Sequence, residues 1–165
     1  MAYRNKTYVC FDADEDIHYY RLLLAMKAKD PDIFPFYNAH DIYPMQKRKL
    51  EDNDERYIKG KLKERFSNTK CFVILVGTKT KNLYKYVRWE IEVALNLDIP
   101  IIVINLNKLN RRDDALCPPI IRNELAIHIP FKKDAISKAM QNWPNSHIRY
   151  RKGGESGSYY YPEFD

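Results

Sequence analysis

Two glutamates of the segment 86–97, Glu90 and Glu92, lie on opposite sides of the helix that this segment predicts. Successive side chains are about 100° apart around a helix, so the apolar side chains of the segment gather on one arc. Glu90 falls inside this arc, about 60° from Val87, whereas Glu92 falls outside it, beside Asn96. A carboxylate that faces the core costs several kcal/mol if it is desolvated and unpaired. Glu90 therefore needs either a chemical role or a partner.

The carboxylate of Glu90 has two uses that fit this position. Beside a ligand it suits acid chemistry or the stabilisation of a cation. Inside the fold it suits a structural ion pair with Arg88 or Lys79, or contact with the positive end of its own helix. The spacing favours neither use over the other. Glu92, on the polar side, is expected to be an ordinary surface acid.

Other common catalytic constellations are missing from the sequence. It contains neither the G-x-x-x-x-G-K-[ST] phosphate loop nor a G-x-G-x-x-G turn after the first predicted strand. Its four histidines are scattered, and His40-Asp41 is the one suggestive pair, so we expect no metal site. Its three cysteines form no C-x-x-C pair, which disfavours a disulfide framework or a zinc site.

A phosphate-accepting receiver domain is another candidate. Asp12 and Asp14 would supply its acid pair after the first strand. Such a domain also needs an aspartate at the end of its third strand, where this chain has Gly77-Thr-Lys. We therefore disfavour this interpretation.

Length and composition are those of a single globular domain. The chain has 165 residues, of which 45% are hydrophobic and 30% charged, enough for one ordinary core. The net charge is +6, but the basic residues are scattered among acids, and no nucleic-acid-binding motif accompanies them. No apolar run reaches the roughly 18–20 residues of a membrane span, and the amino terminus lacks a signal-peptide stretch. We expect a cytoplasmic protein that binds neither membranes nor nucleic acid.

The elements that must position these residues alternate along the chain. Short β-branched runs predict strands, and apolar residues at helical spacing predict helices. Repeated strand–helix units with right-handed crossovers predict an α/β, flavodoxin-like fold, a five-stranded parallel sheet of order 2-1-3-4-5 with helices on both faces. Strands are expected at 6–11, 33–37, 71–77, 99–106 and 125–130, and helices at 15–29, 54–66, 84–97 and 135–143.

The predicted organisation is one domain followed by a tail. Residues 1–145 hold all the predicted elements, whereas 146–165 are polar and Gly-rich and include three consecutive tyrosines. The runs 71–77 and 99–106 are almost wholly apolar, which places them at the centre of the sheet. The polar stretch 38–52 is too long for an ordinary connection, so we expect it to be mobile and to border the pocket.

The carboxyl ends of the strands are the expected ligand edge of such a sheet. Ligands bind there, near the switch point between the first and third strands. This edge is predicted to hold Phe11, Asp12, residues 77–81 and Asn105. An active site should lie among them.

The predicted helix with Glu90 resembles a helix of TIR domains in which an aromatic residue precedes a glutamate. The resemblance rests on residues 85–95, Lys-Tyr-Val-Arg-Trp-Glu-Ile-Glu-Val-Ala-Leu, with an apolar strand on each side. Segments 11–16, 37–41 and 117–125 resemble a bacterial branch of the TIR-like family that includes the TIR subunit of the Thoeris antiphage defence system. The similarity spans roughly residues 4–143. The first strand differs from animal TIR domains, which carry Ser-Tyr where this chain has Asp12-Ala.

In TIR enzymes this glutamate is essential for cleaving NAD. The resemblance therefore implies a TIR-like NAD nucleosidase or cyclase with Glu90 as its catalytic residue, NAD or a related dinucleotide as substrate, and no cofactor. The expected substrate contacts are Phe11, Asp12, Asp41, Lys79, Tyr86, Arg88 and Asn105. The product would be ADP-ribose, or a cyclic or conjugated nucleotide signal that reaches a separate effector protein.

The resemblance also leaves a non-enzymatic interpretation open, because many TIR domains work as assembly modules. Trp89, expected on the outward face of its helix, would then contact a neighbouring molecule. The three terminal tyrosines would dock on another copy of the chain, so self-association is expected. In that case Glu90 would only be a member of an ion pair.

Overall fold

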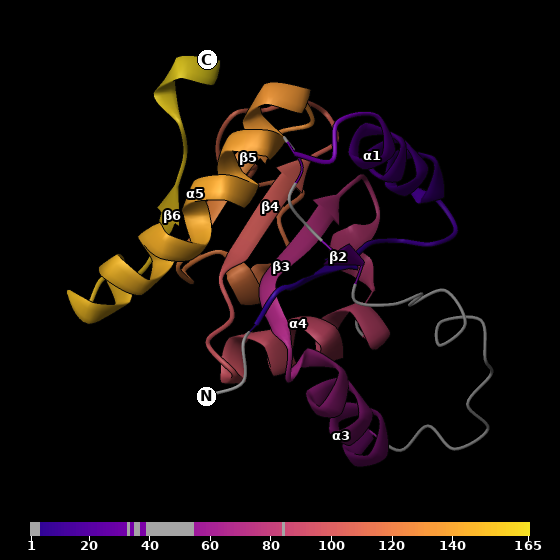
Figure 1. Ribbon diagram of the computed structural model, residues 1–165. Helices are drawn as coiled ribbons and strands as arrows, with labels where there is room; N and C mark the ends of the chain where they lie inside the picture. Colours follow the sequence, from indigo (N-terminus) through magenta and orange to yellow (C-terminus); the bar gives the residue numbers. More distant parts are fainter. Residues whose placement is uncertain (1–3, 33, 35–36, 39–54, 84) are drawn as a thin grey trace.

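A parallel sheet forms the centre of the fold in the computed structural model, which describes residues 4–32, 34, 37–38, 55–83 and 85–165 (Figure 1). Within these residues six strands lie in the order β2-β1-β3-β4-β5-β6, and every neighbouring pair is parallel. The parallel α/β class predicted from the sequence is confirmed, with one strand more than expected at an edge. The strands are β1 (Lys6–Cys10), β2 (Tyr37–Asn38), β3 (Thr69–Val76), β4 (Ile101–Asn105), β5 (Ala126–Pro130) and β6 (Ser158–Tyr159).

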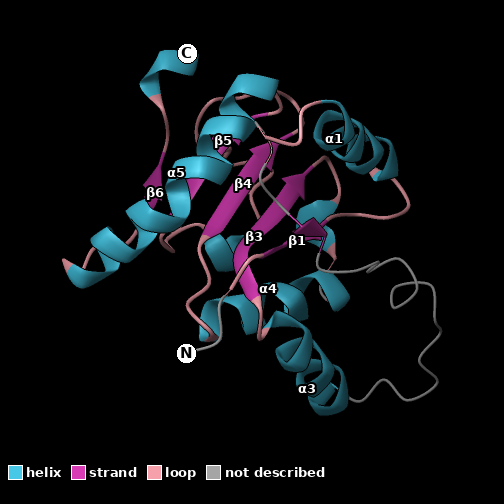
Figure 2. Cartoon of the chain, in the orientation of Figure 1, coloured by secondary structure: helices cyan, strands magenta, loops and turns pink. Residues whose placement is uncertain are grey.

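Helices cover both faces of the sheet (Figures 1 and 2). α3 (Glu55–Phe66) and α4 (Tyr86–Asn96) pack on one face, and α1 (Ile17–Lys29) and α5 (Lys133–Lys152) pack on the other. Each helix buries an apolar stripe, so the core consists of two clusters separated by the sheet. The short 3₁₀ helices among the described residues are η1 (Thr80–Asn82), η2 (Pro119–Ile121) and η3 (Pro162–Phe164).

β3 and β4 are central strands, as their uninterrupted apolar sequences predict. Every residue of β4 is buried, and so is every residue of β3 except Lys70. The two strands pair from Phe72 opposite Ile101 to Val76 opposite Asn105. Because helices cover both faces, these strands have no polar side, and their sequences show no alternation.

α5 is longer than the sequence predicts. We expected it to end before Pro144, since proline lacks a backbone N–H and crowds the carbonyl of the preceding turn. The helix nevertheless continues to Lys152. Trp143, Pro144 and His147 are all buried in this stretch. Their packing outweighs the local preference for a break.

The last residues pack on the domain, and the expectation of a polar tail from residue 146 onward does not match these contacts. β6 pairs with β5 at the edge of the sheet. Tyr159 in β6 stacks on Tyr150 of α5, with ring centroids 4.5 Å apart. Nδ2 of Asn110 donates a hydrogen bond to the backbone carbonyl of Tyr161 at 2.7 Å. The strand pairing and the Asn110 hydrogen bond join residues that are far apart in the sequence.

Two predictions concern residues outside the described ranges. The long loop predicted at 38–52 lies there except for Asn38, which belongs to β2. Asp41, one of the predicted substrate contacts, also lies there. Both remain predictions from the sequence.

Candidate active site

Asp12 begins the carboxyl edge of the sheet, directly beyond β1, and its side chain is buried. Its Oδ1 accepts hydrogen bonds from the backbone amides of Asp14 at 3.1 Å and Glu15 at 3.3 Å. Its carbonyl accepts a hydrogen bond from the amide of Asp16 at 2.8 Å. Asp12 therefore shapes the turn between β1 and α1.

Asn105, at the end of β4, also stabilises a loop at this edge. Its buried Nδ2 donates hydrogen bonds to the backbone carbonyls of Leu109 and Arg111, both at 2.8 Å. These bonds fold the loop after β4 back onto the strand. Asp12 and Asn105 thus lie at the edge where the sequence placed them, but their side chains hold loops.

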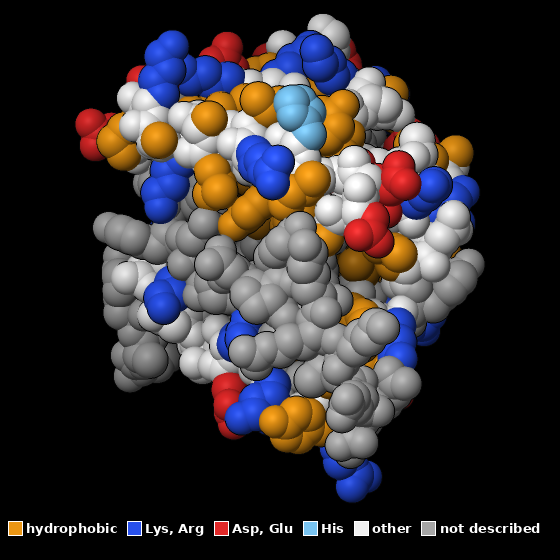
Figure 3. Space-filling view, turned by 90° about the vertical axis from the view of Figure 1, so that its right-hand side faces the viewer, with side chains coloured by type: hydrophobic (Ala, Val, Ile, Leu, Met, Phe, Trp, Pro, Cys, Tyr) orange, Lys and Arg blue, Asp and Glu red, His pale blue; other side chains and the backbone are white. Residues whose placement is uncertain are grey.

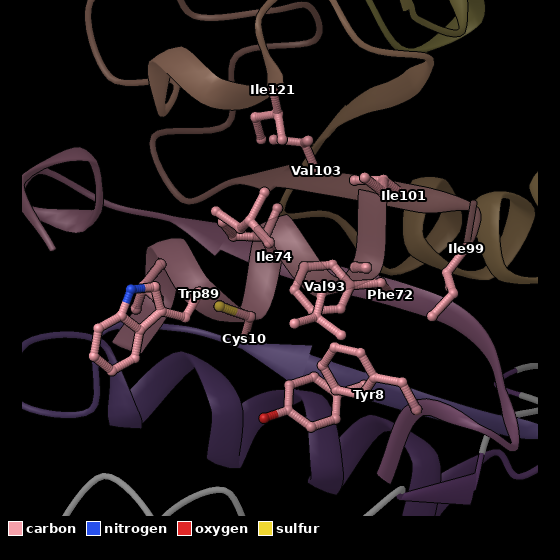
Figure 4. Close-up of a cluster of buried hydrophobic side chains, with 14 of the residues drawn as sticks. Tyr8, Cys10, Phe72, Ile74, Trp89, Val93, Ile99, Ile101, Val103 and Ile121 are labelled. Carbon is pink, nitrogen blue, oxygen red and sulfur yellow. The ribbon is translucent and has the colours of Figure 1, made fainter. Parts of the chain in front are cut away.

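Glu90 is buried in α4, as its place on the helical wheel predicts, with 2% of its surface exposed. The strand next to Glu90 is β1. Tyr8 and Cys10 are two positions apart along β1, so their side chains point to the same face of the sheet. Both project into the cluster under α3 and α4 (Figure 4). Glu90 is therefore a carboxylate inside an apolar layer, near the carboxyl half of β1.

The Tyr8 hydroxyl and the Cys10 thiol lie close enough to Glu90 for its charge to affect the pKa of both groups. Burial raises the pKa of Tyr8 well above its usual value, and the charge of Glu90 raises it further. The same two causes raise the pKa of the Cys10 thiol. Both groups therefore stay protonated and uncharged at neutral pH.

The two cations that the sequence offers as ion-pair partners for Glu90 contact other acids. Nε of Arg88 lies 2.9 Å from Oε1 of Glu92. Nζ of Lys79 lies 3.0 Å from Oε1 of Glu15, beyond the end of β1. Both cations are exposed. Their positions at the edge of the sheet leave them accessible to an anionic ligand.

Glu92 lies outside the apolar arc, as predicted, although it is more than a surface acid. Its side chain is 22% exposed and pairs with Lys59 of α3 as well as with Arg88. Burial of the carboxyl is outweighed by these hydrogen bonds from Lys59 and Arg88, so the pKa of Glu92 is lowered. Glu92 therefore links α4 to α3.

Phe11 and Tyr86, both expected to stack on a ring of the substrate, lie on opposite sides of the sheet. Phe11 is buried and stacks on Tyr20 of α1, with centroids 4.7 Å apart. It belongs to the cluster under α1 and α5, away from the cluster around Glu90. Tyr86 is half-buried and meets Trp89 edge to face at 5.5 Å. Tyr86 is thus the ring that shares a helix with Glu90 and keeps exposed surface.

Trp89 is buried, with 8% of its surface exposed, so the prediction of an outward-facing contact residue is wrong. α4 packs against α3 as well as against the sheet. Its buried arc is therefore wider than the stripe that faces the sheet. Figure 4 shows the indole at one end of the cluster, beside Cys10. The assembly interpretation loses the contact residue on which it relied.

Asp16 is a buried acid that the sequence pattern does not single out, because it belongs to a run of acids that resembles an ordinary turn. It is 7% exposed, and its Oδ2 has no hydrogen-bond partner among the described residues. A Cβ added at Gly77 would lie 2.4 Å from this oxygen, so glycine is needed directly after β3. Burial, followed by the charges of Asp12 and Glu15, raises the pKa of Asp16 to about 6.

Metal ligands, membrane spans and basic stripes bear on other kinds of function. In the part of the chain that the structure describes, no group of three or more His, Cys, Asp or Glu side chains could hold a metal ion. Among the described helices, none combines the length and apolar character needed to cross a membrane. On the face seen in Figure 3, lysines and arginines are dispersed among apolar and acidic side chains. A nucleic-acid groove typically gathers them into a stripe.

Comparison with known families identifies a TIR-like family. A family model described as "Thoeris protein ThsB, TIR-like domain" matches residues 8–111. This is more than half of the 165 residues of the chain. The matched part runs from β1 to the loop after β4 and contains Glu90 together with Tyr8 and Cys10.

Proposed function

Because the chain belongs to the family of TIR-like domains of the Thoeris protein ThsB, which implies a role in antiphage defence, we propose that it cleaves NAD and that Glu90 is the catalytic residue. The observation that carries the proposal is the burial of Glu90 under β1, near the hydroxyl of Tyr8 and the thiol of Cys10, two groups that are uncharged at neutral pH. The structural alternative assigned Glu90 to an ion pair with Arg88 or Lys79. Those two cations contact Glu92 and Glu15 instead.

The reaction needs a negative charge next to the ribose. When the bond between ribose C1′ and the nicotinamide nitrogen breaks, its electron pair leaves with nicotinamide, which departs neutral. Positive charge then develops on the ribose, as in glycoside hydrolysis. The carboxylate of Glu90 would stabilise this oxocarbenium ion. Addition of water gives ADP-ribose and a proton, and attack by a hydroxyl of the same molecule gives a cyclic product.

Tyr8 and Cys10 would act as positioning residues for Glu90. In the substrate complex, hydrogen bonds from these two uncharged groups would hold the carboxylate in one orientation without neutralising its charge. A preorganised charge in an apolar layer acts more strongly on a developing cation than the same charge in water.

The remaining predicted contacts divide into accessible and buried residues. Lys79, Arg88 and Tyr86 keep exposed surface and would bind the pyrophosphate and a ring of the dinucleotide. Phe11, Asp12 and Asn105 are buried and would contribute indirectly, by shaping the carboxyl edge of the sheet. The product would act on a separate effector protein, and self-association would control the onset of activity.

The test pairs Glu90→Gln with Glu92→Gln, two equal changes on one helix. We expect Glu90→Gln to reduce nicotinamide release about 10²–10³-fold, the typical loss of one preorganised electrostatic contact. We expect Glu92→Gln to keep the wild-type rate and to lose roughly 1 kcal/mol of stability or less, since its ion pairs are partly exposed. The measurements are nicotinamide release from NAD, under conditions where the wild type is active, and a melting curve for each variant.

Wild-type turnover in Glu90→Gln would refute the catalytic role. Loss of the fold in Glu90→Gln would instead indicate a structural role. The variant Glu90→Asp distinguishes that structural role from a catalytic one. A shorter carboxylate retains the charge needed for folding but withdraws it from the ribose. A folded, inactive Glu90→Asp therefore supports catalysis.

A further inference from the structure

A second hollow lies at the opposite edge of the sheet, where the strands begin. Its walls come from the segments just before β1 and β4, from the start of β3 and from the last turns of α5. The volume is about 460 Å³. This is within the range of small-molecule sites, which is roughly 300–1,000 Å³. We refer to it as the amino-edge pocket, and it includes none of the residues of the candidate active site.

Positive charge dominates the rim of the amino-edge pocket. Arg4, Lys70 and Lys152 line it and are exposed. None of the three has an acidic partner within ion-pair distance in the described ranges, whereas many other cations of the chain are paired. Unpaired cations around a cavity attract an anion and lose no existing ion pair when they bind it.

Asp98 is the acid of this pocket, and its charge is already compensated. Its Oδ1 lies 3.0 Å from Nε of Arg151 and 3.1 Å from Nε2 of His147. His147 is buried in α5, so Asp98 is held at the wall of the pocket. An anion on the rim therefore meets three free cations and no free carboxylate among the described residues.

The floor of the pocket is apolar. Ile148 lies on α5 with 52% of its surface exposed, which is unusual for a residue of its size. The rings of Pro100 and Pro144 lie on the same lining. These side chains form a surface that a flat ring would cover and remove from water.

We propose that the amino-edge pocket binds a small nucleoside phosphate, with the phosphate on Arg4, Lys70 and Lys152 and the base against Ile148 and the proline rings. The pairing of free cations with an exposed apolar floor selects a ligand with one anionic and one flat apolar end. The volume suits a mononucleotide rather than a segment of a macromolecule. The site is separate from Glu90, so its ligand would be an effector and not the substrate.

The experiment titrates the full ¹⁵N-labelled chain with AMP, adenosine and inorganic phosphate and follows the backbone amides by NMR. In the wild type we expect AMP to shift the amides of Asp98, His147 and Ile148. Lys70→Gln combined with Lys152→Gln should weaken AMP about tenfold or more, because two charge-assisted contacts are lost. Ile148→Ala should weaken AMP and adenosine but leave inorganic phosphate unchanged.

Lys63→Gln is the matched control, because Lys63 is an exposed lysine of α3 that does not line this pocket. It should bind AMP like the wild type. Equal AMP affinity in the double lysine variant and in Lys63→Gln overturns the proposal. So does AMP binding that shifts amides of α4 and leaves those of Asp98 and Ile148 in place. No arm depends on NAD turnover, so failure here leaves the proposed catalytic role intact.

Discussion

The environment of a single side chain, Glu90, is created by two residues of another element. Tyr8 and Cys10 bring an O–H and an S–H near the carboxylate, and neither carries charge at neutral pH. The ring of Tyr8 has its own place in the core, stacked parallel to Phe72 with centroids 5.6 Å apart. Its hydroxyl can therefore be removed without disturbing the packing of the ring.

Tyr8→Phe tests whether this hydroxyl positions Glu90. If the hydroxyl donates to Glu90 in the substrate complex, nicotinamide release should fall about 10- to 100-fold, since a hydrogen bond to a charged group contributes roughly 1.5–3 kcal/mol. The acid limb of the pH–rate profile should then move to higher pH, because the carboxylate loses this donor. Both are measured on the purified variant beside the wild type.

Tyr57→Phe is the control, because Tyr57 is 54% exposed on α3. It should change neither the rate nor the profile. A Tyr8→Phe variant with the wild-type rate and an unmoved acid limb would show that the contact with Glu90 has no catalytic consequence.

Among the elements, β6 and the residues after it show how a polar, Gly-rich segment becomes part of a sheet. Tyr159 packs on Tyr150 and lies 5.9 Å from Trp143, measured between ring centroids. Its hydroxyl donates a hydrogen bond to Glu155. The neighbouring Tyr160 is 41% exposed and contacts Arg111 through its ring. The two adjacent tyrosines are therefore packed to different extents.

Tyr159→Ala should lower the free energy of unfolding by about 1–3 kcal/mol, because a half-buried aromatic contact is lost. Tyr160→Ala should lower it by less than about 1 kcal/mol, the value of an exposed cation–π contact. Chemical denaturation of both variants measures the difference. Equal, small effects would mean that the segment after α5 contributes nothing to the domain.

For the domain as a whole, two buried titratable groups give stability opposite dependences on pH. His128 in β5 is fully buried, and neither ring nitrogen has a hydrogen-bond partner among the described residues. Burial, together with the charge of Arg112, lowers the pKa of His128 to about 4. The unfolded chain takes up this proton near pH 6.5 and the folded chain only near pH 4, so stability falls as the pH drops through this window.

Asp16 acts in the other direction. Its pKa is raised from 3.8 to about 6 in the folded chain, which therefore binds a proton before the unfolded chain does. Stability rises as the pH falls from about 6 to about 4, and this offsets the loss caused by His128. The two effects overlap, so the wild type alone does not reveal either.

Asp16→Asn separates the two groups. At pH 7.5 the variant should be more stable than the wild type by about 1–3 kcal/mol, because it lacks the buried charge. Most of the advantage should disappear near pH 4, where Asp16 is protonated in the folded wild type and its carboxyl in the unfolded chain is close to its own pKa of 3.8. Denaturation of both proteins from pH 7.5 to pH 4 measures this. A constant difference across the range would contradict the buried-charge explanation.

The sequence alone was enough for the parallel α/β class, for β3 and β4 as central strands, and for the burial of Glu90 opposite the more polar position of Glu92. These features are local, because apolar periodicity reports which side of a strand or helix faces the core. The family resemblance added the role proposed for Glu90.

Only the tertiary structure shows which residues contact one another. Tyr8 and Cys10 lie near Glu90 because β1 is the strand that packs against α4. A periodic pattern cannot predict this, because the two elements are far apart in the sequence. Trp89 is buried because α3 packs beside α4, and Asp16 has room for its carboxylate because glycine follows β3 at position 77. The segment after Pro144 joins the domain through contacts with residues tens of positions away. Periodicity in the sequence predicts whether a side chain faces the core or the solvent. Packing between distant elements determines which residues that side chain contacts.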